Sequence, residues 1–248
     1  MSREMIPKVI HYCWFGGKLL PPLAKKCIAS WRKYLPDYEI VRWDEDNFDV
    51  EAHPYTRDAY AAGLYAFVSD YARFKILYER GGLYFDTDVE VIKPLDDMIA
   101  AGPFMGFEDD GENGAMAVAP GLGLAAEAGM DVYCEILRRY DGLQFYDEEG
   151  NRNPYSMIPL VTGLLQDEGL KGNSGIEKVA GINVYPSEWL NPFDDATGRL
   201  RVTSNTRSIH WYSKSWMPKE NALAVWTKRM ARRLLGAGLV AKIGKVVK

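Results

Sequence analysis

The sequence predicts an α/β domain whose mixed central sheet is flanked by helices. Short apolar runs of strand length alternate with longer segments of helical period. The chain of 248 residues suits one domain of this class, or one with a small appendage, and its 47% hydrophobic content is ample for a core. A glycine turn follows the first strand, and such turns are typical of a Rossmann-like nucleotide-binding half.

The first two predicted strands enclose a helix. Residues 8–15 form a short apolar strand that a glycine pair closes. The proline pair at residues 21–22 opens a helix, because proline suits the first helical turn, and the helix ends near Pro36. Residues 38–43 alternate as a second strand does. His11, in the first strand, is interpreted as a core histidine.

The most informative stretch is residues 66–94. Phe67, Tyr71 and Phe74 recur at helical spacing, which predicts a helix with one buried face. A glycine pair ends this helix, because glycine adopts the left-handed C-cap conformation at no steric cost. An aromatic strand at residues 83–85 follows, and two acids come directly after it.

The two acids are Asp86 and Asp88. Residues two apart in an extended chain point to the same side, so both carboxylates aim at one point. This arrangement is costly without a positive charge, and a divalent cation with oxygen ligands is the natural occupant. A solvated turn is the plain alternative for such a pair.

Two further charges lie in the preceding helix. Asp70 and Arg73 are one helical turn apart and share a face. Their placement suggests a polar site on a rigid scaffold, and an ordinary helix salt bridge is the alternative interpretation.

The rest of the chain contributes further elements. The predicted strands are residues 104–108, 115–119, 183–185 and 207–212. The predicted helices are residues 55–63, a long amphipathic helix at 122–140, and one that begins at 158 and includes 167.

Cysteine usage and charge bear on location and partners. Cys13, Cys27 and Cys134 lack metal-binding spacing and leave one thiol over under any pairing, which indicates reduced thiols in the cytoplasm. We expect no secretory leader and no membrane span. The net charge is −4 although residues 228–248 hold seven Lys or Arg and no acid, and an acidic body argues against nucleic-acid binding.

A longer pattern surrounds the acid pair: S-D-x-x-R followed by G-G-x-Y-x-D-x-D. It resembles the signature of the DXD-containing glycosyltransferases of family 32, which include initiating mannosyltransferases of the yeast type and many bacterial capsular polysaccharide transferases. The core of the large clostridial glucosylating toxins is also similar. Residues 6–17 and 209–216 resemble the beginning and end of the same family. The matching residues are Ser69, Asp70, Arg73, Gly81, Gly82, Tyr84, Asp86 and Asp88.

The resemblance implies a GT-A fold and a metal-dependent, retaining glycosyltransferase in polysaccharide biosynthesis, for example of a capsule. The donor is a nucleotide sugar, with a UDP-sugar favoured over GDP-mannose, and the acceptor is a glycan or a lipid-linked glycan. The implied catalytic residues are Asp86, Asp88, Asp70 and Arg73. Mn²⁺ or Mg²⁺ is held by Asp86, Asp88 and His210, and the imidazole favours Mn²⁺.

The resemblance also implies a donor site. Thr162-Gly163 resembles a T-G-P element, although Leu164 replaces the proline. Ser215 and Trp216 resemble a closing loop whose hydroxyl and indole reach the diphosphate. Trp14 is a candidate ring near the nucleotide, and a packing role suits it equally. The donor-binding residues are Trp14, Ser69, Asp70, Arg73, Tyr84, Asp86, Thr162, Gly163, Ser215 and Trp216.

The resemblance covers residues 1–220, which we expect to form the catalytic domain, and residues 221–248 form a basic amphipathic tail. Basic clusters alternate there with Leu, Val and Ile. Such a helix suits an anionic membrane surface, so residues 228–248 predict a peripheral contact with the inner face of the cell membrane. A solvated helix or disorder is the alternative.

Two other functions compete with a transferase. A phosphatase of the haloacid dehalogenase type would use Asp86 as nucleophile, but Glu90 stands where that motif requires Thr or Val. A non-catalytic sugar-nucleotide-binding protein would retain the site without turnover.

Overall fold

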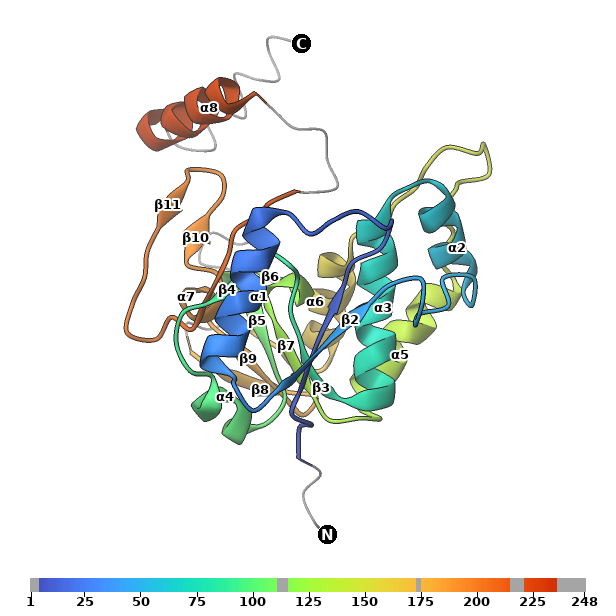
Figure 1. Cartoon of the computed structure of the whole chain (residues 1–248), viewed down its shortest axis with the longest axis horizontal. Coiled ribbons are helices and arrows are strands. Elements are labelled where there is room, and N and C mark those ends of the chain that lie inside the picture. Colours follow the sequence, from blue (N-terminus) through green and yellow to red (C-terminus); the bar gives the residue numbers. More distant parts are fainter. Residues whose placement is uncertain (1–4, 111–115, 173–174, 215–220, 236–248) are drawn as a thin grey trace.

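The computed structural model describes residues 5–110, 116–172, 175–214 and 221–235. Within them, an eight-stranded sheet has the order β2-β1-β3-β7-β5-β9-β8, and β6 pairs with β5 (Figure 1). The sheet strands are β1 (Val9–Cys13), β2 (Glu39–Trp43), β3 (Gly82–Tyr84), β5 (Phe104–Asp110), β6 (Met116–Val118), β7 (Leu124–Ala126), β8 (Glu177–Val179) and β9 (Ile182–Tyr185). The helices are α1 (Pro22–Tyr34), α2 (Pro54–Ala61), α3 (Tyr65–Arg80), α4 (Asp96–Ala101), α5 (Asp131–Asp141), α6 (Met157–Asp167), α7 (Ser187–Leu190) and α8 (Ala222–Leu235).

The sheet is mixed, as predicted. Strand β1 runs parallel to β2 and β3, and β7 pairs antiparallel with β3 and β5. Strand β9 runs parallel to β5. The parallel strands β1 and β3 therefore end at the same edge of the sheet, where the glycine loop and the acid pair follow.

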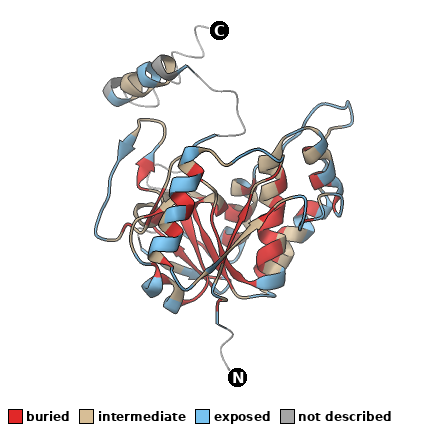
Figure 2. Ribbon diagram, in the orientation of Figure 1, coloured by how far each residue is buried: buried red, intermediate tan, exposed pale blue. Residues whose placement is uncertain are grey.

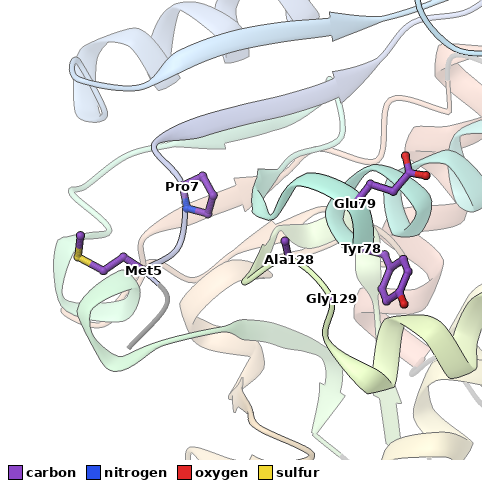
Figure 3. A pocket seen from close by; sticks show the side chains of 6 residues that line it. All are labelled: Met5, Pro7, Tyr78, Glu79, Ala128 and Gly129. Atoms are coloured by element: carbon purple, nitrogen blue, oxygen red, sulfur yellow. The ribbon is translucent and has the colours of Figure 1, made fainter. Parts of the chain in front are cut away.

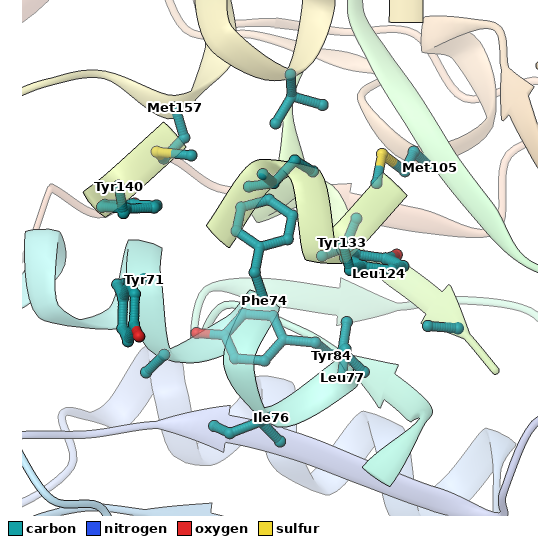
Figure 4. Close-up of a cluster of buried hydrophobic side chains, with 14 of the residues drawn as sticks. Tyr71, Phe74, Ile76, Leu77, Tyr84, Met105, Leu124, Tyr133, Tyr140 and Met157 are labelled. Carbon is teal, nitrogen blue, oxygen red and sulfur yellow. The ribbon is translucent and has the colours of Figure 1, made fainter. Parts of the chain in front are cut away.

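Helices cover both faces of the sheet, so the strands are buried (Figure 2). On one face, α3, α5 and α6 pack against the sheet around Phe74, Tyr84 and Tyr133, which are each at most 1% exposed (Figure 4). On the other face, α1 buries Trp31 beside Phe85. The expectation of a mixed sheet flanked by helices is confirmed.

Strand β3 lies unusually close to β1. A Cβ on Gly82 would lie 2.8 Å from the Val9 carbonyl oxygen and 3.1 Å from His11 Nε2, and Gly82 has φ +101°. Only glycine combines this backbone conformation with such an approach. Gly81, at φ +64°, ends α3 and donates its N–H to Leu77 O, as the predicted glycine stop requires.

Two small sheets lie beside the main one. Strands β10 (Phe193–Asp194) and β11 (Arg199–Leu200) form a hairpin, and α8 lies over it in Figure 1. Strands β4 (Val89–Val91) and β12 (Ser208–His210) form an antiparallel pair. None of the helices in the described parts of the chain is long and apolar enough to cross a membrane.

The long helix predicted at residues 122–140 is wrong. A 3-10 turn (Pro120–Leu122), strand β7 and helix α5 occupy this segment instead. Gly123 and Gly129 adopt φ +136° and +76°, which a continuous helix does not allow. Between these glycines, Leu124–Ala126 pair as strand β7 with β3 and β5, and this non-local pairing overrides the helical period.

Candidate metal and donor site

The acid pair lies in a turn between β3 and β4. Val89 N–H donates to Asp86 O at 3.0 Å, so the chain turns here. The prediction that an extended chain points both carboxylates to the same side is therefore wrong. The turn itself directs the carboxylates of Asp86 and Asp88 to one place. Strand β4 then starts at Val89, which is fully buried and anchors the end of the turn.

His210 lies in strand β12, more than 120 residues after the acid pair in the sequence. Strand β12 pairs with β4 in a register that sets His210 opposite Val89, next to the turn. His210 Nε2 lies 3.1 Å from Asp88 Oδ1. One ligand atom from each of Asp86, Asp88 and His210 lies within 4.8 Å of the others. The structure therefore brings together all three predicted metal ligands.

Asp88 has several polar partners, and they affect its pKa. Ser213 N–H donates to Asp88 Oδ2 at 2.7 Å, and Trp211 N–H donates to the Asp88 carbonyl at 3.0 Å. Burial favours the neutral acid, but the hydrogen bond and charge of His210, together with Ser213, hold the pKa of Asp88 well below its usual range. Asp88 is therefore ionised at neutral pH.

His210 has the opposite shift. Burial disfavours the imidazolium, but the hydrogen bond and charge of Asp88, with the charges of Asp86 and Glu108, raise the pKa of His210 above its ordinary value. In the described structure its Nδ1 is buried and has no hydrogen-bond partner.

This group of side chains fits a divalent cation. Two carboxylates and an imidazole are the ligands that Mn²⁺ and related ions accept, and Asp88 and His210 contact each other directly. Burial raises the pKa of Asp86, although Arg73 opposes this shift, so a cation beside it would stabilise the carboxylate.

Arg73 links the acid pair to helix α3. Its Nη2 lies 2.9 Å from Asp70 Oδ1 and 3.1 Å from Asp86 Oδ1, and its side chain is 6% exposed. Its guanidinium also lies 5.0 Å from the centre of the Tyr84 ring. Burial raises the pKa of Asp70 to about 6 despite Arg73. Asp70 and Arg73 of helix α3 therefore lie at the predicted site, and Arg73 orients the Asp86 carboxylate.

Some predicted donor residues are used by the fold. Tyr84 is 1% exposed in the core, and the Ser69 hydroxyl donates to Tyr65 O at 3.1 Å. Trp14 is half-buried, and its indole N–H donates to Lys18 O at 2.6 Å in the loop after β1. These contacts hold the three side chains in place, but they do not show which ligand the side chains bind.

The other predicted donor-binding residues are Thr162, Gly163, Ser215 and Trp216. Thr162 is 5% exposed, and its hydroxyl oxygen accepts from Val118 N at 2.9 Å, next to the 3-10 turn. A Cβ on Gly163 would meet nothing within 4 Å. Ser215 and Trp216 lie outside the described residues.

Sequence reasoning did not assign Gly121, Tyr212 or Ser213 to the site. A Cβ on Gly121 would lie 2.4 Å from Asp86 Oδ2, so the glycine allows the carboxylate to occupy its position. Ser213 binds Asp88, and Tyr212 packs its ring against His210. Tyr212 and Ser213 lie within residues 209–216, the stretch that resembles the end of the family, and Gly121 lies between the predicted strand at 115–119 and the predicted helix at 122–140.

An open pocket of about 540 Å³ lies at the other end of β1 and β3 (Figure 3). It is lined by Met5, Pro7, Tyr78, Glu79, Ala128 and Gly129. None of the predicted site residues in the described parts of the chain lines it.

A known protein family matches the part of the chain that contains Asp86 and Asp88. The family described as "glycosyltransferase sugar-binding region containing DXD motif" matches residues 21–105. Inositol phosphoceramide mannosyltransferase 1 of Schizosaccharomyces pombe is 28% identical over 111 residues, which are 42% of this chain and 34% of that protein. An uncharacterized glycosyltransferase, L373, of Acanthamoeba polyphaga mimivirus is 32% identical over 109 residues, covering 40% of this chain and 42% of that protein.

Among solved structures, a glycosyltransferase involved in the glycosylation of the major capsid of PBCV-1 is 13% identical, with a TM-score of 0.45. The alignment covers 84% of this chain and 95% of that one. By contrast, the chain spans about a third of the length of the mannosyltransferase that it matches.

The family match includes the segment on which the sequence-based resemblance rested. Asp70, Arg73, Asp86 and Asp88 all lie inside residues 21–105, and the structure joins them through Arg73 and the turn after β3. The expected resemblance to DXD-containing glycosyltransferases is thereby confirmed over these residues. Residues 21–105 of this chain are similar to the family of glycosyltransferase sugar-binding regions that contain a DXD motif.

Proposed function

We propose that this protein is a metal-dependent glycosyltransferase that moves a sugar from a nucleotide-sugar donor to an acceptor. The observation that carries the proposal is the convergence of Asp86, Asp88 and His210, whose ligand atoms lie within 4.8 Å of one another. The family match supports it, because the acid pair of the DXD motif is the same Asp86 and Asp88.

The proposed chemistry follows from the leaving group. Breaking the bond between the sugar and the diphosphate builds negative charge on the phosphates, and a bound divalent cation supplies a Lewis acid for that charge. Asp88 and His210 hold the cation, and Asp86 contributes a carboxylate that Arg73 keeps in place. Asp70, paired with the same arginine, is available to sugar hydroxyls through its partly exposed carboxylate.

The cation that we propose is Mn²⁺, with Mg²⁺ as the alternative, because an imidazole accompanies the carboxylates. A UDP-sugar is the first donor to test. GDP-mannose is the second, because a similar protein in Schizosaccharomyces pombe is named a mannosyltransferase. Retention of configuration, a glycan or lipid-linked acceptor and a role in capsular polysaccharide synthesis complete the proposal and follow from the family resemblance.

The test is release of nucleoside diphosphate from each sugar nucleotide, with and without Mn²⁺. We expect Mn²⁺-dependent release from one donor, and a loss of about a hundredfold or more in Asp88→Asn, because its charge is removed where phosphate charge develops. The matched control is Asp37→Asn, since the Asp37 side chain is 78% exposed and 3.7 Å from Lys8. Undiminished turnover in Asp88→Asn or in excess chelator contradicts the proposal, and release of inorganic phosphate from monoesters would favour a phosphatase.

A further inference from the structure

Tyr212 has an unusual backbone conformation beside the candidate metal site. Its φ is +48°, in the left-handed region that non-glycine residues seldom adopt. It lies between His210 and Ser213, which both contact Asp88. The surrounding contacts must hold this conformation, because a tyrosine does not adopt it by preference.

The tyrosine hydroxyl supplies one such contact. It donates to Glu108 Oε1 at 2.8 Å, and Asn191 Oδ1 lies 3.1 Å from the same oxygen. The Asn191 amide in turn donates to the Glu108 carbonyl at 3.2 Å. Strand β5 and the end of α7 therefore form a polar anchor for Tyr212.

The tyrosine ring supplies the other contact. Its centre lies 4.1 Å from that of the His210 ring, at an interplanar angle of 61°. The left-handed turn at Tyr212 also presents the next N–H, that of Ser213, to Asp88 Oδ2 at 2.7 Å. If the hydroxyl is released, the ring and the turn both lose the contact that fixes them.

We propose that Tyr212 is a positioning residue of the metal site, which acts through its hydroxyl contact with Glu108 and Asn191. This contact sets the orientation of the His210 imidazole and of the Ser213 N–H around Asp88. The inference rests on the proposed metal-dependent function. Glu108, on β5, is thereby part of the site although it is not a ligand.

The first experiment measures Mn²⁺ binding by calorimetry in the full chain. Tyr212→Phe keeps the ring and removes the hydroxyl, and we expect an affinity about tenfold weaker, the scale found for residues that orient metal ligands. Tyr34→Phe, at the end of α1, is the matched control and should bind as the wild type does. Melting temperatures without metal show whether a variant is folded.

The second experiment separates the hydrogen bond from the charge of Glu108. Glu108→Ala removes the acceptor and should weaken Mn²⁺ binding as Tyr212→Phe does, with no further loss in the double variant. Glu108→Gln keeps an oxygen acceptor and should restore binding. Equal losses in the Ala and Gln variants would mean that charge acts rather than position, and that result would overturn the proposal.

Failure of the positioning role and failure of the metal-dependent function would give different results. If wild-type protein binds Mn²⁺ and Asp88→Asn does not, but Tyr212→Phe binds as tightly as the wild type, the positioning role is wrong and the metal site stands. If the wild type does not bind Mn²⁺ at all, both the metal-dependent function and this inference are wrong.

Discussion

At the scale of single residues, His11 shows how burial determines the state of a titratable group. The side chain is 2% exposed, its Nε2 lies 3.1 Å from Gly81 O, and its Nδ1 accepts from the Trp43 indole at 3.1 Å. Burial, with a smaller contribution from Arg80, lowers the pKa of His11 to about 4, although the bond to Gly81 opposes the shift. This is the core histidine that the sequence predicted.

A pH dependence of stability follows from His11. The unfolded chain binds a proton below about pH 6.5, whereas the folded chain does so only near pH 4, so stability falls as the pH falls through this window. The loss is about 3 kcal/mol between pH 7 and pH 4. We expect His11→Gln to lose this part of the dependence, as urea unfolding at several pH values would show. Parallel pH profiles for the two proteins would refute the explanation.

Gly121 tests whether the position of Asp86 matters to the site. In Gly121→Ala the new Cβ would lie 2.4 Å from Asp86 Oδ2, so the carboxylate must move. We expect Mn²⁺ affinity to fall about tenfold and the free energy of unfolding to fall by about 1 to 3 kcal/mol. Gly142→Ala is the matched control, because the nearest atom to its Cβ is 3.9 Å away. Wild-type Mn²⁺ affinity in Gly121→Ala would show that Asp86 does not need this position.

At the scale of elements, α8 binds the loop of the β10–β11 hairpin. Arg229 pairs with Asp195 at 2.8 Å, and Arg233 donates to the carbonyls of Thr197 and Gly198 at 2.7 and 3.0 Å. Asp195 also pairs with Lys214, next to Ser213. Part of the basic face that was predicted to meet a membrane therefore contacts the protein itself. Residues 236–248 of that predicted tail lie outside the described residues.

The docking of α8 can be tested by limited proteolysis. Replacing Arg229 and Arg233 with Ala removes the hydrogen bonds to the hairpin, which contribute about 1 kcal/mol each. We expect cleavage within α8 to become at least about fivefold faster, because the undocked population rises by that factor. Lys25→Ala, on the exposed side of α1, is the control. Unchanged cleavage would show that the arginine contacts do not hold the helix.

At the scale of the whole molecule, ligand binding should stabilise the fold. A sugar nucleotide with Mn²⁺ at about a hundred times its dissociation constant adds about 2.7 kcal/mol, or roughly 5 to 10 °C in melting temperature for a domain of this size. A chelator should abolish the shift, and Asp88→Asn should prevent it. A shift of equal size in chelator would indicate binding that does not require the metal.

Local signals in the sequence identified most of the fold. The glycine stop at Gly81, the proline at the start of α1 and the aromatic strand before Asp86 each depend on neighbouring residues alone, and each is present in the structure. The segment at residues 122–140 could not be predicted in this way. Its strand is stabilised by two neighbours that are distant in sequence, β3 and β5, and its apolar residues followed a helical period that its glycines interrupt.

The sequence by itself determined which groups are available: the acids at 86 and 88, the arginine one helical turn from Asp70, and a histidine late in the chain. Only the tertiary structure decided that they meet. The β4–β12 pairing brings His210 to Asp88, the turn at Asp86 replaces an extended strand, and Glu108 anchors Tyr212. Such contacts depend on pairing and burial between distant segments, which side-chain spacing along the chain does not specify.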